Sequence, residues 1–512
     1  RQLPPTLRGT LFKNGPGRFS RGGRDYAHWL DGDGYVTALR FSDAGVQWSG
    51  RFVETDAYRQ EEGAGAIVYR TTFGTQRAGG AAANAADIRL KSPANTNVAC
   101  FGGELLALWE AGPPYALHMD DLSCAGPSSL GGRLVVSERH GALPATTGIA
   151  QLDRALEQAG LLCDACSAHP RGDALGTTFW TWRQRLFGPP AIEVCLHCVP
   201  AAGPPPAAVR ATLAGVAFAP HDMALSRNFA VFVSSPTRVN IAPFVAGLKG
   251  PAQCTTFDLR AIRAGGGSTV HLVHRDGSDV QRFPLAVPIH PVHHAAAWEG
   301  AASEVHVLTA GWPAAAVRRM AVAGRDLLGS WEKLLTGDFE GVPMTNLYHI
   351  IIDTSTGDVR HTVLAGGAQL DHPKVHPHWE ARPARYVFAT MGRTSNGGDE
   401  DCTPAAPQRF ACVDVQSGAV VDSWHAGSRR LVDEAVLIPK GGREDMSSER
   451  DLWLVAPVFD GASCTTTYVV LDGAHLSAGP LAEIPLPTHI PWALHGIWVP
   501  ARHKDAQVKR NG

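Results

Sequence analysis

Hydrophobic residues occur along this chain in short runs that alternate with polar, turn-forming segments. The runs are rich in β-branched and aromatic residues and are bounded by Gly, Asp, Ser or Pro, a pattern typical of β-strands rather than helices. The clearest runs are residues 35–41, 105–108, 229–233, 305–308, 347–353, 386–389, 411–415, 452–455 and 468–471. We therefore predict an all-β protein.

The turn signals between these runs indicate how the strands connect. Thr356-Gly357-Asp358 and Ser417-Gly418 separate consecutive runs by the few residues expected of antiparallel hairpins. Among the all-β architectures, a propeller most easily holds a chain of 512 residues in one domain. We expect one propeller domain over residues 1–502 and a polar C-terminal tail over 503–512. Residues 149–160 and 329–336 have helical patterns and are expected as insertions on this framework.

Composition and charge exclude several classes of protein. The net charge of −2 gives no electrostatic reason to expect nucleic acid as a partner. No apolar run reaches the roughly 18 residues of a membrane-spanning helix. Ten cysteines in 512 residues are too sparse for a disulfide scaffold, so we expect an intracellular protein, cytoplasmic or plastid. The chain begins at Arg1 without a methionine, so we expect that a start codon is missing, with or without a transit or signal peptide, and the N-terminus does not indicate the location.

Four of the 22 histidines have unusual settings. Each has Pro or Gly within two residues and lies at the end of an apolar segment; they are His169, His221, His293 and His495. The strand ends of a propeller converge on its axis, so four imidazoles from four separate blades could meet there and bind a metal. Taken singly, each of these histidines could equally be a packed or capping residue.

Several blocks of the sequence, in order along the chain, resemble the carotenoid cleavage oxygenase family, also called the retinal pigment epithelium protein family. They are residues 7–17 (LRGTLFKNGPG), 28–34 (HWLDGDG), 73–77 (FGTQR), 95–98 (NTNV) and 105–110 (LLALWE). The four histidine settings match the iron-ligand segments of this family in the same order. The resemblance covers nearly the whole chain.

The resemblance implies a seven-bladed β-propeller with a dome of loops and short helices over an axial Fe(II). The implied ligands are His169, His221, His293 and His495, with His293 preferred over its neighbour His294. The family also has three acidic residues that accept hydrogen bonds from ligand imidazoles, and the matching positions are Glu110, Asp371 and Glu434. Asp371 departs from the family, which usually has Glu there. Because Asp is one methylene shorter, the backbone moves in, a water bridges the gap, or the imidazole loses its partner.

The activity implied by the resemblance is oxidative cleavage of a conjugated C=C bond of a carotenoid or apocarotenoid by O₂, giving aldehyde or ketone products. We assign no acid or base, because iron would activate O₂ beside a positioned alkene. Such a hydrophobic polyene needs an apolar tunnel. The candidate tunnel residues are Thr96, Phe101, Trp109, Trp298 and Trp492. For the aromatic residues, propeller core is the alternative interpretation, and for Thr96 it is a strand hydroxyl satisfied by the backbone.

Two alternative functions remain open from the sequence. The family includes stilbene-cleaving enzymes, which recognise a phenol partly through a lysine immediately before the first acidic residue. Trp109 occupies that position here and cannot supply an ammonium group, so its presence favours the apocarotenoid branch and retinal-type products. The second alternative, from another class, is a catalytically silent propeller that binds a carotenoid.

Two further features need an interpretation. The pairs Cys163/Cys166 and Cys195/Cys198 resemble a structural zinc site, although cysteines three residues apart on a strand face opposite sides of the sheet. The apolar segment 186–192 (LFGPPAI) is a candidate for peripheral membrane contact, with an internal loop as the alternative.

Overall fold

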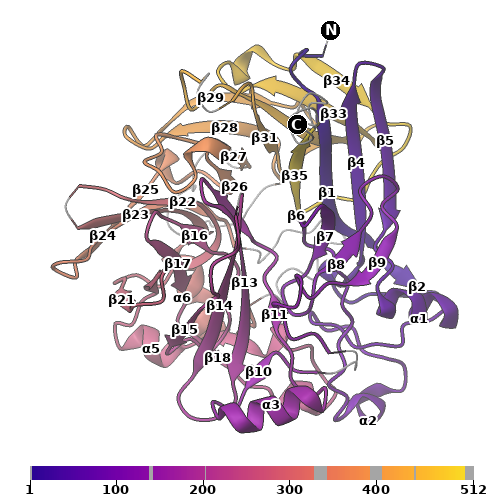
Figure 1. Cartoon of the computed structure of the whole chain (residues 1–512), viewed down its shortest axis with the longest axis vertical. Coiled ribbons are helices and arrows are strands. Elements are labelled where there is room, and N and C mark those ends of the chain that lie inside the picture. Colours follow the sequence, from indigo (N-terminus) through magenta and orange to yellow (C-terminus); the bar gives the residue numbers. More distant parts are fainter. Residues whose placement is uncertain are drawn as a thin grey trace, which may run out of the picture.

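The computed structural model describes residues 3–137, 142–201, 203–301, 303–327, 343–392, 406–442 and 446–501. Its main feature is a set of seven sheets that follow one another in chain order around the molecule (Figure 1). The first sheet contains both ends of the described chain, because β1 pairs antiparallel with β35 (Figure 1). Its strands, in spatial order, are β35 (His495–Pro500), β1 (Gly9–Arg18), β4 (Asp33–Ser42) and β5 (Gly45–Phe52). This pairing closes the ring.

Each of the other six sheets is formed from strands that are close in sequence. The second contains β6 (Asn97–Phe101), β7 (Glu104–Leu108), β8 (Tyr115–Leu117) and β9 (Cys124–Pro127). The third contains β10 (Ala145–Thr146), β11 (Ala165–Cys166), β12 (Arg171–Asp173), β13 (Gly176–Arg185), β14 (Ala191–Pro200) and β15 (Val209–Ala214). The fourth contains β16 (Ala224–Leu225), β17 (Phe229–Ser234), β20 (Thr269–His274) and β21 (Val280–Pro284).

The last three sheets continue the ring. The fifth contains β22 (His290–Glu299), β23 (Glu304–Trp312), β24 (Asn346–Asp353) and β25 (Val359–Val363). The sixth contains β26 (Leu370–Lys374), β27 (Tyr386–Met391), β28 (Arg409–Asp414) and β29 (Ala419–His425). The seventh contains β30 (Arg430–Val432), β31 (Val436–Pro439), β32 (Leu452–Asp460), β33 (Thr465–Asp472) and β34 (Ala482–Pro485). The predicted all-β, seven-bladed propeller is therefore confirmed.

The hydrophobic core lies between neighbouring sheets. Val307 and Leu308 are consecutive in β23 and point to opposite faces, as strand geometry requires. Val307 packs with residues of the fourth sheet and Leu308 with residues of the sixth. Since both faces of the blades are covered, their strands appear in the sequence as continuous apolar runs, and each of the nine predicted runs overlaps a strand.

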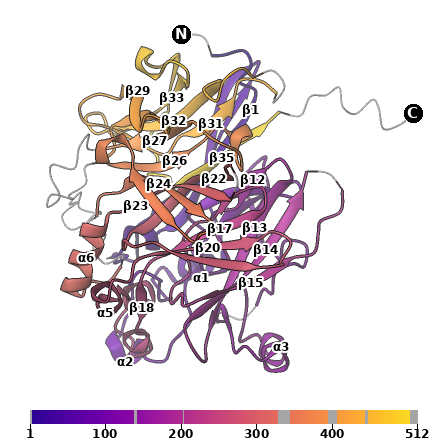
Figure 2. The ribbon, with the colours of Figure 1, turned by 90° about the vertical axis from the view of Figure 1, so that its left-hand side faces the viewer.

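Short helices and two small two-stranded sheets are added to this framework. The small sheets are β2 (Ser20–Arg21) with β3 (Arg24–Asp25) and β18 (Thr237–Val239) with β19 (Thr255–Phe257). The helices are α1 (Asp56–Ala64), α2 (Gly80–Asn84), α3 (Ala150–Gln158), α4 (Ala242–Val245), α5 (Leu259–Arg263) and α6 (Ala314–Ala323). Figure 2 shows α2, α3, α5 and α6 in the lower half of the molecule.

The helix predicted over 149–160 is confirmed as α3. The helix predicted over 329–336 and the tail at 503–512 lie outside the described residues, and the single-domain boundary at 502 stays a prediction. In the described part of the chain, no helix has the length and apolar character needed to cross a membrane.

Candidate metal centre and cavity

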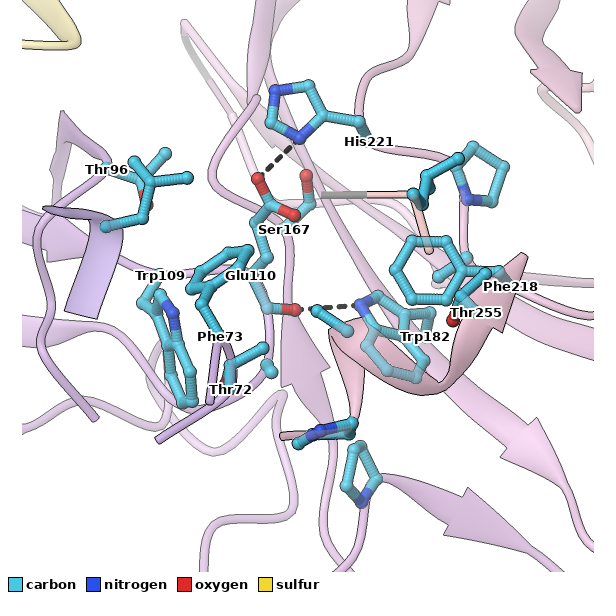
Figure 3. Close-up of a pocket in the computed structure, with 18 of the residues that line it drawn as sticks. Thr72, Phe73, Thr96, Trp109, Glu110, Ser167, Trp182, Phe218, His221 and Thr255 are labelled. Atoms are coloured by element: carbon cyan, nitrogen blue, oxygen red, sulfur yellow. Dashed lines mark hydrogen bonds and ion pairs between the residues drawn. The ribbon is translucent and has the colours of Figure 1, made fainter. Parts of the chain in front are cut away.

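A large cavity of about 1620 Å³ lies under the helices and loops and reaches the axis of the propeller. Aromatic rings form much of its wall, among them Phe73, Trp109, Trp182 and Phe218 (Figure 3). Trp312 and Trp492 also line it. The indole of Trp182 donates a hydrogen bond of 2.9 Å to the backbone carbonyl of Glu110, which fixes this ring against the segment that follows β7. Thr96 also lines the cavity, and its hydroxyl donates to the side-chain oxygen of Asn95 at 3.2 Å.

Two of the predicted tunnel residues lie elsewhere, which corrects their expected placement. Phe101 packs edge-on against Phe179, with ring centres 6.0 Å apart, in the core between the second and third sheets. Trp298 stacks on His306, with ring centres 4.9 Å apart and planes at 9°. Neither ring is part of the cavity wall. Thr96, Trp109 and Trp492 are the predicted residues that the structure places there.

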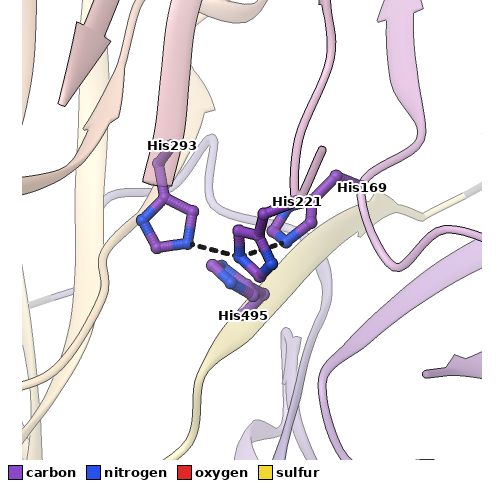
Figure 4. A group of neighbouring side chains, drawn as sticks. All are labelled: His169, His221, His293 and His495. Atoms are coloured by element: carbon purple, nitrogen blue, oxygen red, sulfur yellow. Dashed lines mark hydrogen bonds between the residues drawn. The ribbon is translucent and has the colours of Figure 1, made fainter. Parts of the chain in front are cut away.

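Four histidines from four different sheets come together beside this cavity, and His221, His293 and His495 are part of its wall (Figure 4). His169 and His221 lie just before β12 and β16, His293 lies within β22, and His495 begins β35. The register of β22 shifts on both sides of His293, which are the irregularities that re-aim a side chain at a strand edge. All four histidines lie in or just before a strand at the edge of its sheet, and their side chains turn towards one point.

The four imidazoles are close enough to share one ion. Nε2 of His221 lies 3.0 Å from Nε2 of His169 and 3.3 Å from Nε2 of His293. One nitrogen from each of the four rings lies within 4.8 Å of the others. Two nitrogens bound at right angles to one ion, each at about 2.1 Å, would be separated by about 3 Å. The spacing therefore matches a mononuclear metal centre.

Three carboxylates fix the tautomers of three ligands. Nδ1 of His221 donates to Glu110 at 2.5 Å, Nδ1 of His293 to Asp371 at 2.7 Å, and Nδ1 of His495 to Glu434 at 2.8 Å. The carboxylates accept and do not donate, so each Nδ1 carries the proton and each Nε2 keeps its lone pair. Three lone pairs that converge in this way repel one another unless a cation lies between them. The donor set therefore fits a bound metal ion.

The pKa values of these groups follow from burial and from the pairing. Burial alone would raise the pKa of Asp371, but the adjacent His293 holds it well below its usual range. Burial likewise opposes ionisation of Glu434, and Lys374, His495 and Lys13 together hold its pKa well below the usual range. Burial lowers the pKa of His495 to about 4, although Glu434 acts in the opposite direction. Both acids are charged at neutral pH, as acceptors must be.

His169 differs from the other three ligands because no carboxylate lies within hydrogen-bond distance of it in the described part of the chain. Its Nδ1 lies 4.0 Å from Asp222, whose carboxylate is held by Arg171 and by the backbone N–H of His294. Burial and the neighbouring imidazoles hold the pKa of His169 well below its ordinary value, which keeps the ring neutral. The sequence indicated neither Arg171 nor Asp222.

The shorter Asp371 reaches His293 directly because the backbone bends at the next residue. His372 has φ of 51°, in the left-handed region that non-glycine residues rarely adopt. Its backbone N–H donates to the Asp371 carboxylate at 2.7 Å, and the register of β26 shifts between Asp371 and Lys374. The sequence left open whether the backbone moves towards His293, a water bridges the gap or the imidazole loses its partner. The structure shows the first of these.

Two lysines hold Glu434 and were not indicated by the sequence. Lys374 Nζ lies 2.8 Å from Oε1 of Glu434, the same oxygen that accepts from His495. Lys13 is fully buried in β1, donates to the backbone carbonyl of Glu434 at 2.5 Å, and lies 3.6 Å from its Oε2. A lysine on a strand is usually exposed, so no local signal distinguishes these two.

The cysteine pairs do not assemble into a second metal centre. Among the described residues, three or more potential ligands lie close enough to hold an ion at the four-histidine cluster, and the cysteines are not part of such a group. Cys195 and Cys198 lie in the strand β14, where residues three apart face opposite sides, and all four thiols are free.

The described residues thus define a β-propeller protein in which four histidines, beside an aromatic cavity, form a group that fits a metal ion. The model of the family described as retinal pigment epithelial membrane protein matches residues 2–500, and the chain belongs to this family. The family predicted from the sequence blocks is confirmed.

Known relatives and solved structures agree with this assignment. The apocarotenoid-15,15′-oxygenase of Synechocystis sp. is 29% identical over 503 residues, which cover 97% of this chain and 91% of the relative. The resveratrol cleavage oxygenase 1 of Aspergillus fumigatus is 26% identical over 508 residues, covering 94% and 87%. The crystal structure of the cobalt-substituted Synechocystis enzyme superposes with a TM-score of 0.80 at 28% identity, covering 98% of this chain and 94% of that one.

Proposed function

We propose that this protein is a non-haem Fe(II) dioxygenase that cleaves a conjugated C=C bond of an apocarotenoid or carotenoid with O₂, giving aldehyde or ketone products. The observation that carries the proposal is the convergence of four Nε2 atoms beside a large aromatic cavity. Its similarity to the Synechocystis apocarotenoid-15,15′-oxygenase over nearly the whole chain supports the substrate class.

Fe(II) is the proposed metal because neutral imidazoles suit it and four of them leave open coordination positions. When bound, Fe(II) supplies the activation of O₂, which is the co-substrate. Glu110, Asp371 and Glu434 each hold the Nδ1 proton of a ligand imidazole, and so keep Nε2 free to bind. The chain needs no acid or base of its own for this reaction.

The protein positions the substrate and excludes water. The cavity exceeds the roughly 300–1,000 Å³ of an ordinary small-molecule pocket, and a long polyene needs such a length. Indole and phenyl rings, such as those of Trp109, Phe73 and Trp182, stack on a conjugated chain without requiring a polar group from it. The rigid polyene would thus lie with one double bond beside the histidine cluster.

A stilbene is the second candidate substrate, favoured by the similarity to the resveratrol cleavage oxygenase. Two observations weigh against it. Trp109 precedes Glu110 and lines the cavity, where an indole cannot pair with a phenolate. No lysine is among the described residues that form the cavity wall. An apocarotenoid therefore remains the leading substrate.

We also propose that the protein contacts a membrane peripherally at the mouth of the cavity. Leu186, Val239, Ile241 and Val245 line the cavity and are each at least 40% exposed, and Phe187 beside them is 64% exposed. An apolar rim around an apolar cavity would let a membrane-dissolved polyene enter without crossing water. The proposed location is intracellular, cytoplasmic or plastid, which the free cysteines support.

The test is an aerobic incubation of the Fe(II)-loaded protein with a long apocarotenal and a hydroxystilbene in one tube, with the products identified by mass spectrometry. Apocarotenal fragments bearing new aldehydes are expected, and they locate the cleaved bond. Aromatic aldehydes from the stilbene would instead support the second candidate. Recovery of both compounds unchanged, from protein shown to contain iron, would contradict the enzyme and leave a carotenoid-binding protein. Protein stripped of metal is the control.

A further inference from the structure

A fifth imidazole lies beside the metal centre and is not one of the four ligands. The ring of His372 is centred 5.1 Å from that of His293 and 5.6 Å from that of His495, and it lines the cavity. It is not part of the group of converging ligand nitrogens. The Fe(II) chemistry proposed above has no role for it.

The backbone presents this ring to the cavity at a cost. His372 adopts a left-handed conformation with φ of 51°, which a histidine rarely adopts. Such strain is found mainly at functional sites, where surrounding contacts enforce it. Here the backbone N–H of His372 is bound to Asp371 and the register of β26 shifts at this point. The same bend that brings Asp371 to His293 therefore also directs the imidazole of His372.

The hydrogen bonds around Thr390 determine which ring nitrogen of His372 carries the proton. The Thr390 hydroxyl donates its one proton to the backbone carbonyl of Asp371 at 3.0 Å. Its oxygen lies 3.4 Å from Nδ1 of His372, so in this long contact Nδ1 must be the donor. Nε2 of the neutral ring is then an acceptor with a free lone pair.

His372 lines the cavity, and its Nε2 is not completely buried. Among the described residues this nitrogen has no hydrogen-bond partner. Since it is also not fully buried, a bound molecule can reach it. A hydrocarbon bound over this atom would remove it from water and leave the acceptor unsatisfied, whereas a hydroxyl would satisfy it.

We propose that His372 is a specificity-determining residue whose Nε2 accepts a hydrogen bond from a hydroxyl group of the conjugated substrate. The inference rests on one part of the proposed function, namely that the cavity binds the substrate. A ring hydroxyl of a polyene and a phenol of a stilbene share this chemistry, and matched pairs of compounds distinguish them.

The experiment compares a long apocarotenal with and without a ring hydroxyl, and a hydroxystilbene with the unsubstituted stilbene. Binding to the metal-loaded protein is measured without O₂ by quenching of tryptophan fluorescence, and kcat and KM are measured in air. We expect the wild type to favour the hydroxylated member of one pair about 10-fold, through Kd and KM rather than kcat. The pair that responds identifies the source of the hydroxyl. Equal binding within both pairs would overturn the proposal.

Three variants locate the effect. His372→Phe removes the acceptor, and we expect the preference to fall to near unity. His372→Asn leaves no acceptor at the position of Nε2, because its amide ends one atom short of it, and Asn tolerates a left-handed backbone in case the phenylalanine variant does not fold. His290→Phe is the matched control, because His290 is another imidazole of the cavity wall whose Nδ1 lies 2.7 Å from Ser235. We expect it to keep the preference.

Other outcomes separate this inference from the proposed function. If both His372 variants lose the bound metal, His372 belongs to the metal centre and the inference is overturned. If the preference disappears in His290→Phe and persists in the His372 variants, the inference is also overturned. Selective anaerobic binding without any cleavage in air would contradict the proposed function and support the inference. Cleavage of the hydroxylated and the unhydroxylated compound of each pair at equal kcat/KM would support the proposed function and contradict the inference about His372.

Discussion

The carboxylate of Asp371 accepts a hydrogen bond of 2.7 Å from Nδ1 of His293. The same oxygen accepts the backbone N–H of His372, also at 2.7 Å, across a residue held at φ of 51°. The short side chain and the bent backbone therefore act as one unit that orients a metal ligand. A glutamate on this backbone would carry its carboxylate one methylene further towards the imidazole of His293.

We predict that Asp371→Glu weakens metal binding about 10-fold, because the added methylene displaces either the carboxylate or His293. The measurement is a competition titration of Fe(II) or Co(II) against a chelator. Asp371→Asn is the companion variant, since it keeps the shape and removes the charge, and it should also bind more weakly. Wild-type affinity in Asp371→Glu would show that the backbone relaxes freely and that the site is not built around aspartate.

We predict that His293→Ala abolishes metal loading and that His294→Ala does not. The two residues are adjacent in β22 and both are buried, but only His293 points its Nε2 into the cluster. Metal content by elemental analysis is the measurement, and circular dichroism checks that each variant keeps its β structure. Full loading of His293→Ala would remove this residue from the ligand set.

The β-strands could be predicted because the blades bury both faces. In a run such as 305–308 the apolar residues Val305, Val307 and Leu308 are all buried against neighbouring sheets, and only His306 is partly exposed. The helix α1 was missed because its sequence is mainly polar. It begins at a cap in which Thr55 accepts the backbone N–H of Tyr58, a signal that is short and common.

The errors at the site have a physical cause. Trp298 and Phe101 are each five residues along a strand from a residue at the centre, His293 and Thr96. At about 3.3 Å per residue, such a residue lies roughly 16 Å away, in the blade rather than at the axis. On a strand that runs outward from the axis, a residue close in sequence to a metal ligand can therefore lie far from the metal centre. Lys374 and His372 were missed for the opposite reason, because their partners Glu434 and His495 are distant in sequence.

We predict that Trp109→Lys lowers kcat/KM for a long apocarotenal by about 10-fold and raises turnover of a hydroxystilbene. The ring lines the cavity next to Glu110, so the variant replaces a stacking surface with an ammonium group that can pair with a phenolate. Products are quantified by mass spectrometry at matched iron content. If the ratio of kcat/KM for the two substrates is unchanged, residue 109 does not determine whether the protein prefers an apocarotenoid or a stilbene.

We predict that the double variant Leu186→Ser, Phe187→Ser reduces binding to lipid vesicles several-fold, since it removes apolar area from the rim of the cavity. Co-sedimentation with vesicles is the measurement. Val421→Ser is the matched control, because Val421 is 45% exposed on β29 and does not line the cavity. Equal loss of binding in the control would contradict a specific contact at the mouth.

We predict that His271 makes the protein less stable as the pH falls from about 6.5 to about 4. This ring is fully buried in β20, and burial and Arg282 lower its pKa from the ordinary value of about 6.5 to about 4. Between these two values the unfolded chain binds a proton that the folded chain does not. The free energy of unfolding therefore falls as pH falls through that window, by about 2 kcal/mol between pH 7 and pH 4.5.

The structural reason is that Nδ1 of His271 has no hydrogen-bond partner among the described residues, while Nε2 lies 3.0 Å from the Ser234 hydroxyl. Protonation would place a charge in the core between strands. His271→Gln removes the titrating group, so its free energy of unfolding should fall less than that of the wild type over the same range. Chemical unfolding at several pH values measures both slopes. The same substitution at the exposed His118 should leave the wild-type slope unchanged, and identical slopes for His271→Gln and wild type would refute the prediction.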